Sequence, residues 1–326
     1  MTRMRIAILN DYQHAALDLA DWDSLGAEEV KVFDEAFPDD DALVDQLKEF
    51  DVLVAMRERT RFPAQVLNRL DRLKLIVTTG WANMGIDYDA ANANGITLCG
   101  TGYPFSSCTS ELAWALILAA ARQIPAEIGS VRAGGWGKTV GIGLEGRTLG
   151  LVGLGTLGTR VARVGQAFDM NTIAWSQNLT VEKAAEKGVT YVSKRELFAQ
   201  SDFVVINLIL SKRTRGLVGA DDIAAMKSTA FLINTSRGPI LDEDALVEAL
   251  QERRIAGAGL DTVNVEPLPL DHPLRSLDNA VVTPHIGYVT DGNYKVFYEE
   301  MVEDIAAFAA GEPIRVLDQE FIASYR

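Results

Sequence analysis

The chain has 326 residues, of which 48% are hydrophobic, so it is long enough for two domains with apolar cores. Asp and Glu number 45 against 31 Lys and Arg, which gives a formal net charge of −14. This acidic excess disfavours nucleic acid and anionic membranes as partners. Cys99 and Cys108 match no disulfide framework or zinc pattern, and the longest apolar run, 112–121, is about half a bilayer span. We therefore expect a cytoplasmic protein without a bound metal.

Short β-rich runs alternate with helical stretches in the first hundred residues. The expected strands are 4–9, 30–33, 52–56 and 75–79, with helices that include 40–50 and 63–70. This alternation predicts a parallel sheet with helices on both faces. An Ala/Leu-rich helix over 110–122 and a glycine-rich loop over 134–146 follow.

A second series of strands begins after this loop. Its strands are expected at 148–152, 172–175, 203–208, 230–234, 256–260 and 280–283, with an intervening helix over 242–253. A last helix over 293–310 precedes a short strand at 313–317, which we expect to return to the first series. The fold class is therefore α/β, with two doubly wound parallel-sheet domains of the Rossmann or flavodoxin type and a cleft between them. Residues 1–102 plus 290–326 would form one domain, and 103–289 the other.

A glycine loop opens the second series. Gly153, Gly155 and Gly158 form a G-x-G-x-x-G pattern between a strand and a helix over 159–168. In dinucleotide-binding sites the first glycine allows a tight turn, the second lets the backbone approach a pyrophosphate, and the third lets helix and strand pack closely. The helix N-terminus supplies N–H donors to the phosphates. We expect cofactor contacts from Gly153, Gly155, Thr156, Leu157 and Gly158.

The end of the next strand bears on the choice between NAD and NADP. An NAD-preferring site places Asp or Glu there for the adenosine ribose. This strand ends in the uncharged residues Ser176, Gln177 and Asn178, and the nearest cation is Lys183. The missing carboxylate removes repulsion against a 2′-phosphate. We expect these three residues to contact NAD or NADP, with NADP the slightly better match.

Three later segments place ionisable residues at strand ends, where open α/β sheets bind ligands. They contain Arg237, Asp261 with Glu266, and His285. Together with the glycine loop, this order and spacing resembles the D-isomer-specific 2-hydroxyacid dehydrogenase family, which includes glyoxylate/hydroxypyruvate reductases and phosphoglycerate dehydrogenases. The segments 87–91, 110–111 and 132–136 also fit the family, so the resemblance covers nearly the whole chain.

The resemblance implies a catalytic role for each of these residues. Arg237 would bind the substrate carboxylate through its planar fork and polarise the carbonyl. His285 would donate the proton, and Glu266 would pair with it, orient its ring and favour its charged form. Asp261 would face the nicotinamide amide, with further cofactor contacts from Thr235, Ser236, His285 and Gly287. Each residue alone could also have a purely structural role. Their joint occurrence at the positions that match the family favours a catalytic role.

The first domain would bind the substrate, and the second the dinucleotide. In the family, the loop after one strand presents backbone N–H groups to the substrate carboxylate, which implies Gly80, Trp81 and Ala82 here, with a large ring beside the substrate. Arg57 is either a second substrate contact or part of a solvated charge cluster. His14 and His272 are more easily explained as structural residues, although His14 could reach the cleft.

The function predicted is an NAD(P)-dependent dehydrogenase that reduces a small 2-oxo acid to the D-2-hydroxy acid and catalyses the reverse reaction. The alternative is a dinucleotide-sensing binding protein or corepressor of the same fold, because such proteins keep the same residues; turnover would discriminate the two. A formate-dehydrogenase-like activity is disfavoured because that subgroup has glutamine at the position of Glu266. A homodimer is expected from the resemblance, the apolar helix 112–121 and the Gly/Trp-rich segment after it.

Overall fold

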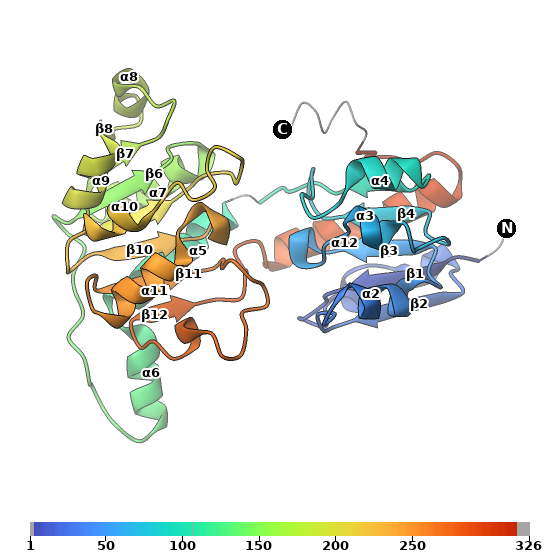
Figure 1. The fold of residues 1–326 in the computed structure, drawn as a ribbon, viewed down its shortest axis with the longest axis horizontal. Helices are drawn as coiled ribbons and strands as arrows, with labels where there is room; N and C mark the ends of the chain where they lie inside the picture. The colour runs from blue at the N-terminus through green and yellow to red at the C-terminus, as the bar shows by residue number, and fades with distance from the viewer. Residues whose placement is uncertain (1–2, 106, 318–326) are drawn as a thin grey trace. The chain divides into compact units, whose positions relative to one another are not determined.

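The structure is a computed structural model that describes residues 3–105 and 107–317 (Figure 1). It divides into two compact units. The first contains the described residues up to Phe105 and those from Val289 onward, and the second contains residues 107–288. Each unit is built on a parallel sheet, which confirms the predicted fold class. Among the described residues, no helix combines the length and apolarity needed to cross a bilayer.

The first unit contains a five-stranded sheet in the order β2-β1-β3-β4-β5. Its strands are β1 (Arg5–Leu9), β2 (Glu29–Phe33), β3 (Val52–Ala55), β4 (Leu75–Thr78) and β5 (Thr97–Gly100), all paired in parallel. β3 and β4 are buried at every position, as expected for central strands covered on both faces. The sequence did not predict β5, because only Leu98 and Cys99 in it are apolar.

Helices cover the first sheet. They are α1 (Ala16–Leu19), α2 (Asp40–Leu47), α3 (Ala64–Leu67), α4 (Tyr88–Ala93), α12 (Asp291–Ala309) and the 3₁₀ turns η1 (Trp22–Leu25) and η2 (Arg57–Arg59). α12 packs against α1, η1 and β4 although it lies at the far end of the chain.

The segment after α12 returns to the first sheet, as predicted. The Leu317 N–H donates to the Leu98 carbonyl, and the Gly100 N–H donates to the Arg315 carbonyl. The expected strand over 313–317 is wrong, however, because only an isolated bridge joins Val316 to Cys99. Pro313 has no N–H to donate, and Arg315 has a φ of +50°, so extended pairing cannot continue through this segment.

The second unit contains a seven-stranded sheet in the order β12-β11-β10-β9-β6-β7-β8. Its strands are β6 (Thr148–Val152), β7 (Asn171–Trp175), β8 (Thr190–Tyr191), β9 (Phe203–Ile206), β10 (Phe231–Asn234), β11 (Gly257–Leu260) and β12 (Ala280–Val282). The chain runs outward from β6 to β8 and then returns to β9 on the other side of β6. This reversal creates a switch point at the carboxyl ends of β6 and β9, where doubly wound sheets bind ligands.

The helices of the second unit differ in their burial. They are α5 (Cys108–Ala121), α6 (Ile124–Arg132), α7 (Thr156–Ala167), α8 (Val181–Ala185), α9 (Lys194–Gln200), α10 (Ala220–Ala224) and α11 (Glu243–Gln251), with 3₁₀ turns η3 (Gly238–Ile240) and η4 (Pro273–Arg275). α5 packs on α7, β10 and β11, whereas α6 has no buried residue and projects beyond the sheet (Figure 1). The sequence did not predict α6, which contains Pro125 and Gly129.

Candidate active site

The three glycines of the loop after β6 meet different surroundings. Gly153 has a φ of +100°, and a Cβ atom there would overlap the carbonyl oxygen of Asn207. A Cβ at Gly158 would overlap the Gly153 carbonyl oxygen, whereas a Cβ at Gly155 would meet nothing within 4 Å. Two glycines therefore permit close packing of the chain, and the third leaves open space above the loop.

That open space lies at the start of α7, a helix of 12 residues whose N-cap, Gly155, offers no side-chain cap. The first-turn N–H groups, including those of Thr156 and Leu157, have no intrahelical acceptor by the geometry of a helix terminus. Free donors and the positive end of the helix dipole suit a pyrophosphate. The residues present therefore fit a dinucleotide.

A surface hollow of about 410 Å³ adjoins the glycine loop beside the end of β7. Two of the predicted cofactor residues, Ser176 and Asn178, lie in its wall, and the exposed Gln177 stands between them in the same turn. The full lining is Leu154, Gly155, Ser176, Asn178, Leu179, Lys183, Glu186 and Lys187. The structure thus brings the glycine loop and the uncharged strand end to one hollow.

The ionisable residues singled out in the sequence follow three neighbouring strands. Arg237 comes after β10, Asp261 and Glu266 after β11, and His285 after β12. Because these strands are parallel and adjacent, all four residues lie at the carboxyl edge of the sheet, the same edge as the glycine loop.

His285 and Glu266 form a direct pair. His285 Nδ1 lies 2.7 Å from Glu266 Oε2, and the other carboxylate oxygen of Glu266 accepts from the Val263 N–H at 3.2 Å. His285 Nε2 has no hydrogen-bond partner among the described residues. The ring edge also meets Tyr288, with centroids 5.5 Å apart. A carboxylate on one ring nitrogen fixes the imidazole and leaves the other nitrogen for proton exchange, which is the arrangement of a general acid/base.

Asp261 is buried and holds the turn that presents His285. Its Oδ1 accepts from Thr283 Oγ1 at 2.6 Å and from the Ile286 N–H at 2.8 Å, while Oδ2 accepts from the Gly287 N–H at 2.9 Å. Burial raises the pKa of the Asp261 carboxyl, and these three hydrogen bonds oppose that rise. His285 has a φ of +54°, a strained conformation that the bonds on either side of it stabilise.

Side-chain hydrogen bonds stabilise the turn after β10. The Asn234 side chain donates to the Arg237 carbonyl at 3.1 Å and accepts from the Ser236 N–H at 3.0 Å. The Ser236 hydroxyl donates to the Ile206 carbonyl at 2.9 Å, and Thr235 is buried. The Ser236 hydroxyl is therefore engaged inside the protein. Asn234, which the sequence analysis did not single out, positions Arg237.

Arg57 follows β3 in the first unit and is also strained, with a φ of +51°. Its N–H donates to Thr79 Oγ1 at 2.9 Å, and its carbonyl accepts from Asn83 Nδ2 at 2.6 Å. The guanidinium lies over the Tyr103 ring, 5.8 Å from its centroid, and beside Gly80, where a Cβ would overlap Nη1. Buried Asn83 and Thr79 thus act as positioning residues that the sequence did not indicate.

The loop from Gly80 to Ala82 offers backbone donors beside Arg57. The Gly80 N–H already donates to Thr101 Oγ1 at 3.0 Å. The N–H groups of Trp81 and Ala82 have no acceptor in the described part of the chain, so they are the two donors open to an anion. The Trp81 side chain is 48% exposed, so its indole is open to solvent beside these donors.

The two remaining histidines lie elsewhere. His14 Nδ1 is 3.6 Å from Asp34 Oδ2 on an exposed surface of the first unit. His272 Nδ1 accepts from the Leu274 N–H at 3.2 Å, which caps η4. The His272 contact agrees with the structural role expected for that residue.

Comparison with known proteins adds independent evidence. Residues 114–287 match the sequence model of the D-isomer specific 2-hydroxyacid dehydrogenase NAD binding domain. A D-3-phosphoglycerate dehydrogenase from Methanocaldococcus jannaschii is 37% identical over 273 residues, which cover 83% of this chain and 52% of that protein. The chain therefore spans about half the length of that relative.

Two further proteins match over most of both chains. A glyoxylate reductase from Korarchaeum cryptofilum is 34% identical over 296 residues, covering 89% of this chain and 89% of that protein. The crystal structure of a phosphoglycerate oxidoreductase from Vibrio cholerae o395 superposes with a TM-score of 0.89 at 36% identity, covering 94% of this chain and 99% of that one. The resemblance first drawn from the glycine loop and strand ends is confirmed: the chain belongs to the D-isomer specific 2-hydroxyacid dehydrogenase family of oxidoreductases.

Proposed function

We propose that this protein catalyses the reversible reduction of a small 2-oxo acid, of the glyoxylate or hydroxypyruvate type, to the D-2-hydroxy acid. NAD or NADP would carry the hydride, with NADP the better fit to the uncharged strand end at 176–178. The observation that carries the proposal is the His285–Glu266 pair, which lies at the same sheet edge as the glycine loop. His285 Nδ1 is 2.7 Å from the Glu266 carboxylate, and Nε2 is the nitrogen on the other side of the ring. The cytoplasm is the expected location.

The bound dinucleotide would supply a hydride to the carbonyl carbon of the acid. The glycine loop and the first turn of α7 would hold its pyrophosphate, and residues 235, 236, 261 and 287 would contact the rest of the cofactor. His285 Nε2 gives a proton to the carbonyl oxygen and takes it back in the reverse direction. Glu266 stabilises the charged imidazole and keeps its ring oriented. Asp261 fixes the turn that carries the imidazole.

The substrate carboxylate needs cationic and N–H donors. Arg237 provides a planar fork at the carboxyl end of β10. In the first unit, Arg57 and the N–H groups of Trp81 and Ala82 provide a second set of donors on a loop held by Asn83. Charge-assisted hydrogen bonds of this kind bind and orient a carboxylate.

Steady-state turnover tests the proposal. NADH and NADPH oxidation is measured with glyoxylate, hydroxypyruvate, pyruvate and a larger 2-oxo acid. Consumption of cofactor with at least one of these acids, lost in His285→Gln, supports the enzyme. Tight cofactor binding without oxidation by any of the acids would instead establish a dinucleotide-sensing protein.

The role of Glu266 has its own readout. Glu266→Gln keeps a hydrogen-bonding side chain but removes the negative charge that favours the protonated ring. Reduction needs the protonated ring, so its pH–rate profile is expected to lose activity at a lower pH than in wild type. Identical profiles for the two proteins would assign the proton transfer to another group.

We also propose a homodimer, formed through α6 and the segment after it. The helix predicted at 112–121 is not available for this contact, because α5 is largely buried within its own unit. The exposed apolar side chains lie farther along, at Ile124, Ile128, Val131, Trp136 and Val140, the last two 89% and 91% exposed. Glu127 braces this segment by accepting from the Lys138 N–H at 2.9 Å.

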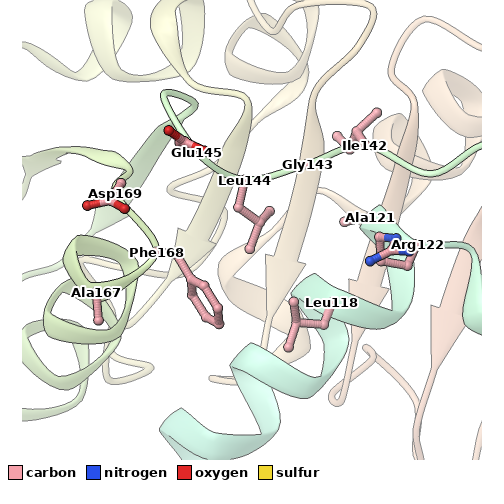
Figure 2. Close-up of a pocket in the computed structure, with 10 residues that line it drawn as sticks. All are labelled: Leu118, Ala121, Arg122, Ile142, Gly143, Leu144, Glu145, Ala167, Phe168 and Asp169. Atoms are coloured by element: carbon pink, nitrogen blue, oxygen red, sulfur yellow. The ribbon is translucent and has the colours of Figure 1, made fainter.

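A second hollow of about 350 Å³ lies at the edge of the sheet opposite the glycine loop. Leu118, Leu144 and Phe168 converge there from α5, the segment before β6 and the end of α7, and Arg122, Glu145 and Asp169 stand around them (Figure 2). Exposed apolar side chains of this kind are typical of a contact between subunits. Light scattering is expected to show a dimer that Trp136→Ser with Val140→Asp weakens; a monomeric wild type at micromolar concentration would contradict this.

A further inference from the structure

The hollow beside the glycine loop contains two lysines that belong to neither the loop nor the strand end. Lys183 lies in α8, and Lys187 follows it. The Lys187 ammonium donates to the Leu154 carbonyl at 2.6 Å, which ties α8 to the glycine loop. A lysine ammonium has three N–H donors, so two donors of Lys187 remain for a ligand.

Within the described part of the chain, these two cations lack carboxylate partners. No Asp or Glu oxygen lies within 4.0 Å of either ammonium among the described residues. Lys194 and Lys227 of the same unit, by contrast, pair with Asp222 at 2.7 Å and with Asp202 at 3.0 Å. An unpaired cation fixed in a concave wall attracts an anion more strongly than one neutralised by the protein.

The position of the hollow indicates which anion it takes. Its wall includes Leu154 and Gly155 of the loop suited to a pyrophosphate, and Ser176 and Asn178 of the strand end that faces the adenosine ribose in doubly wound folds. Ser176 and Asn178 carry no charge to repel a phosphate there. One carboxylate, that of Glu186, shares the lining with the two lysines, so cations outnumber anions around the hollow.

We propose that Lys187, assisted by Lys183, binds the 2′-phosphate of NADP and so determines cofactor preference from the turn after α8. This deepens the proposed function, since it rests on dinucleotide binding at the glycine loop. Lys187 is the principal ligand because its ammonium is already positioned by Leu154, whereas the Lys183 side chain is exposed.

The test uses binding, which needs no turnover. Isothermal titration calorimetry of the full chain compares its affinity for adenosine 2′,5′-bisphosphate with its affinity for 5′-AMP. Inorganic phosphate is titrated alone. Wild type is expected to bind the bisphosphate at least tenfold more tightly than 5′-AMP. Lys187→Gln is expected to lose about 10- to 100-fold in bisphosphate affinity with little change for 5′-AMP, the range for a charge-assisted hydrogen bond. Lys187→Arg keeps the charge and is expected to retain most of the preference.

Further variants sharpen the assignment. Lys183→Gln is expected to have a smaller effect in the same direction, and Glu186→Gln to strengthen bisphosphate binding. Lys295→Gln, an exposed lysine of α12 in the other unit, makes the same change in net charge and is expected to leave both ligands unaffected. Thermal melting of each variant establishes that it is folded.

Several outcomes would overturn the proposal. Equal binding of the two nucleotides by wild type, or an equal loss of both in Lys187→Gln, would show that the lysine does not recognise the 2′-phosphate. Binding of inorganic phosphate as tightly as the bisphosphate would indicate a simple phosphate site. The proposed function fails separately: absent turnover with intact bisphosphate preference would contradict the dehydrogenase and keep the lysine site, whereas turnover with NADH and no bisphosphate preference would do the reverse.

Discussion

The two sheets place different chemistry at their carboxyl ends. In the second unit, charged side chains follow three adjacent strands. Two of them, His285 and Glu266, form a pair with a nitrogen–oxygen distance of 2.7 Å. In the first unit, one arginine stands beside backbone N–H groups of the loop after β4. Proton transfer needs a particular side chain, whereas a carboxylate can be bound by main-chain donors that any residue supplies.

Both sites nevertheless hold their central residue in the same way. His285 and Arg57 have φ values of +54° and +51°, and neighbouring polar side chains hydrogen-bond to the backbone around each. Asp261 accepts from the N–H groups after His285, and Thr79 with Asn83 engage the N–H and carbonyl of Arg57. Strain of this kind persists only where the surroundings stabilise it, so both residues are positioned in advance of a ligand.

The largest expected effect comes from the side-chain chemistry of the second unit. His285→Gln is expected to lower kcat for 2-oxo acid reduction by about 10²–10⁴-fold, the usual range for a positioned proton donor, with cofactor affinity nearly unchanged. Stopped-flow turnover and cofactor titration measure the two quantities. His14→Gln, on an exposed surface, is the matched control. Near-full turnover in His285→Gln would contradict the proposal that the second unit provides the proton donor.

The first unit is expected to affect substrate binding. Arg57→Met removes the cation beside Gly80 while keeping a side chain of comparable length. We expect KM for the 2-oxo acid to rise by about 10- to 100-fold, as for the loss of a charge-assisted hydrogen bond, with a smaller change in kcat. Steady-state kinetics at saturating cofactor measures this split. A fall in kcat with an unchanged KM would instead place Arg57 with the catalytic groups.

The candidate site of the second unit could be proposed from the sequence because it depends on residue types and their spacing. The glycine pattern and the residues Arg237, Glu266 and His285 are visible in the sequence because each position requires a particular side chain. In the first unit, the sequence does not reveal the roles of Thr79 and Asn83, because these residues act through hydrogen bonds to the Arg57 backbone. Lys187 was also missed, because it reaches the glycine loop only through the tertiary packing of α8.

The same reasoning explains the errors in the fold. Several of the strands that were predicted are continuous apolar runs, such as Phe203–Ile206, which is buried on both faces. β5 and α6 lack such patterns. α6 in particular has Ile124, Ile128 and Val131 at helical spacing, but Pro125 and Gly129 interrupt the pattern, and none of its residues is buried.

The glycine loop permits a comparison within one motif. Gly158→Ala places a methyl group against the Gly153 carbonyl, and we expect it to lower the free energy of unfolding by about 1–3 kcal/mol, the range for overpacking. Gly155→Ala meets open space, so stability is expected to change little while NAD(P)H affinity falls. Chemical denaturation and cofactor titration separate the two effects. Equal loss of stability in both variants would show that Gly155 is also a packing residue.

The last comparison concerns two buried aspartates, one in each unit. Asp261 has donors on both carboxylate oxygens. Among the described residues, Asp304 of α12 has Arg315 on Oδ1, at 2.9 Å, and no partner on Oδ2. Burial, opposed by Arg315 and assisted by the negative charges of Glu300 and Glu303, raises the pKa of Asp304 to about 7. The folded chain therefore binds this proton more tightly than the unfolded chain does.

A carboxyl whose pKa is raised in the folded state stabilises the protein when protonated, so its contribution declines as pH rises from about 4 to about 7. Asp304→Asn imitates the neutral carboxyl. Its stability is expected to come closest to that of wild type near pH 4 and to exceed it by a few kcal/mol at pH 8, measured by chemical denaturation at both values. Glu299→Gln, an exposed residue of the same helix, controls for the change in net charge. If the difference between Asp304→Asn and wild type is the same at both pH values, the carboxyl is ionised throughout, and Arg315 alone compensates its burial.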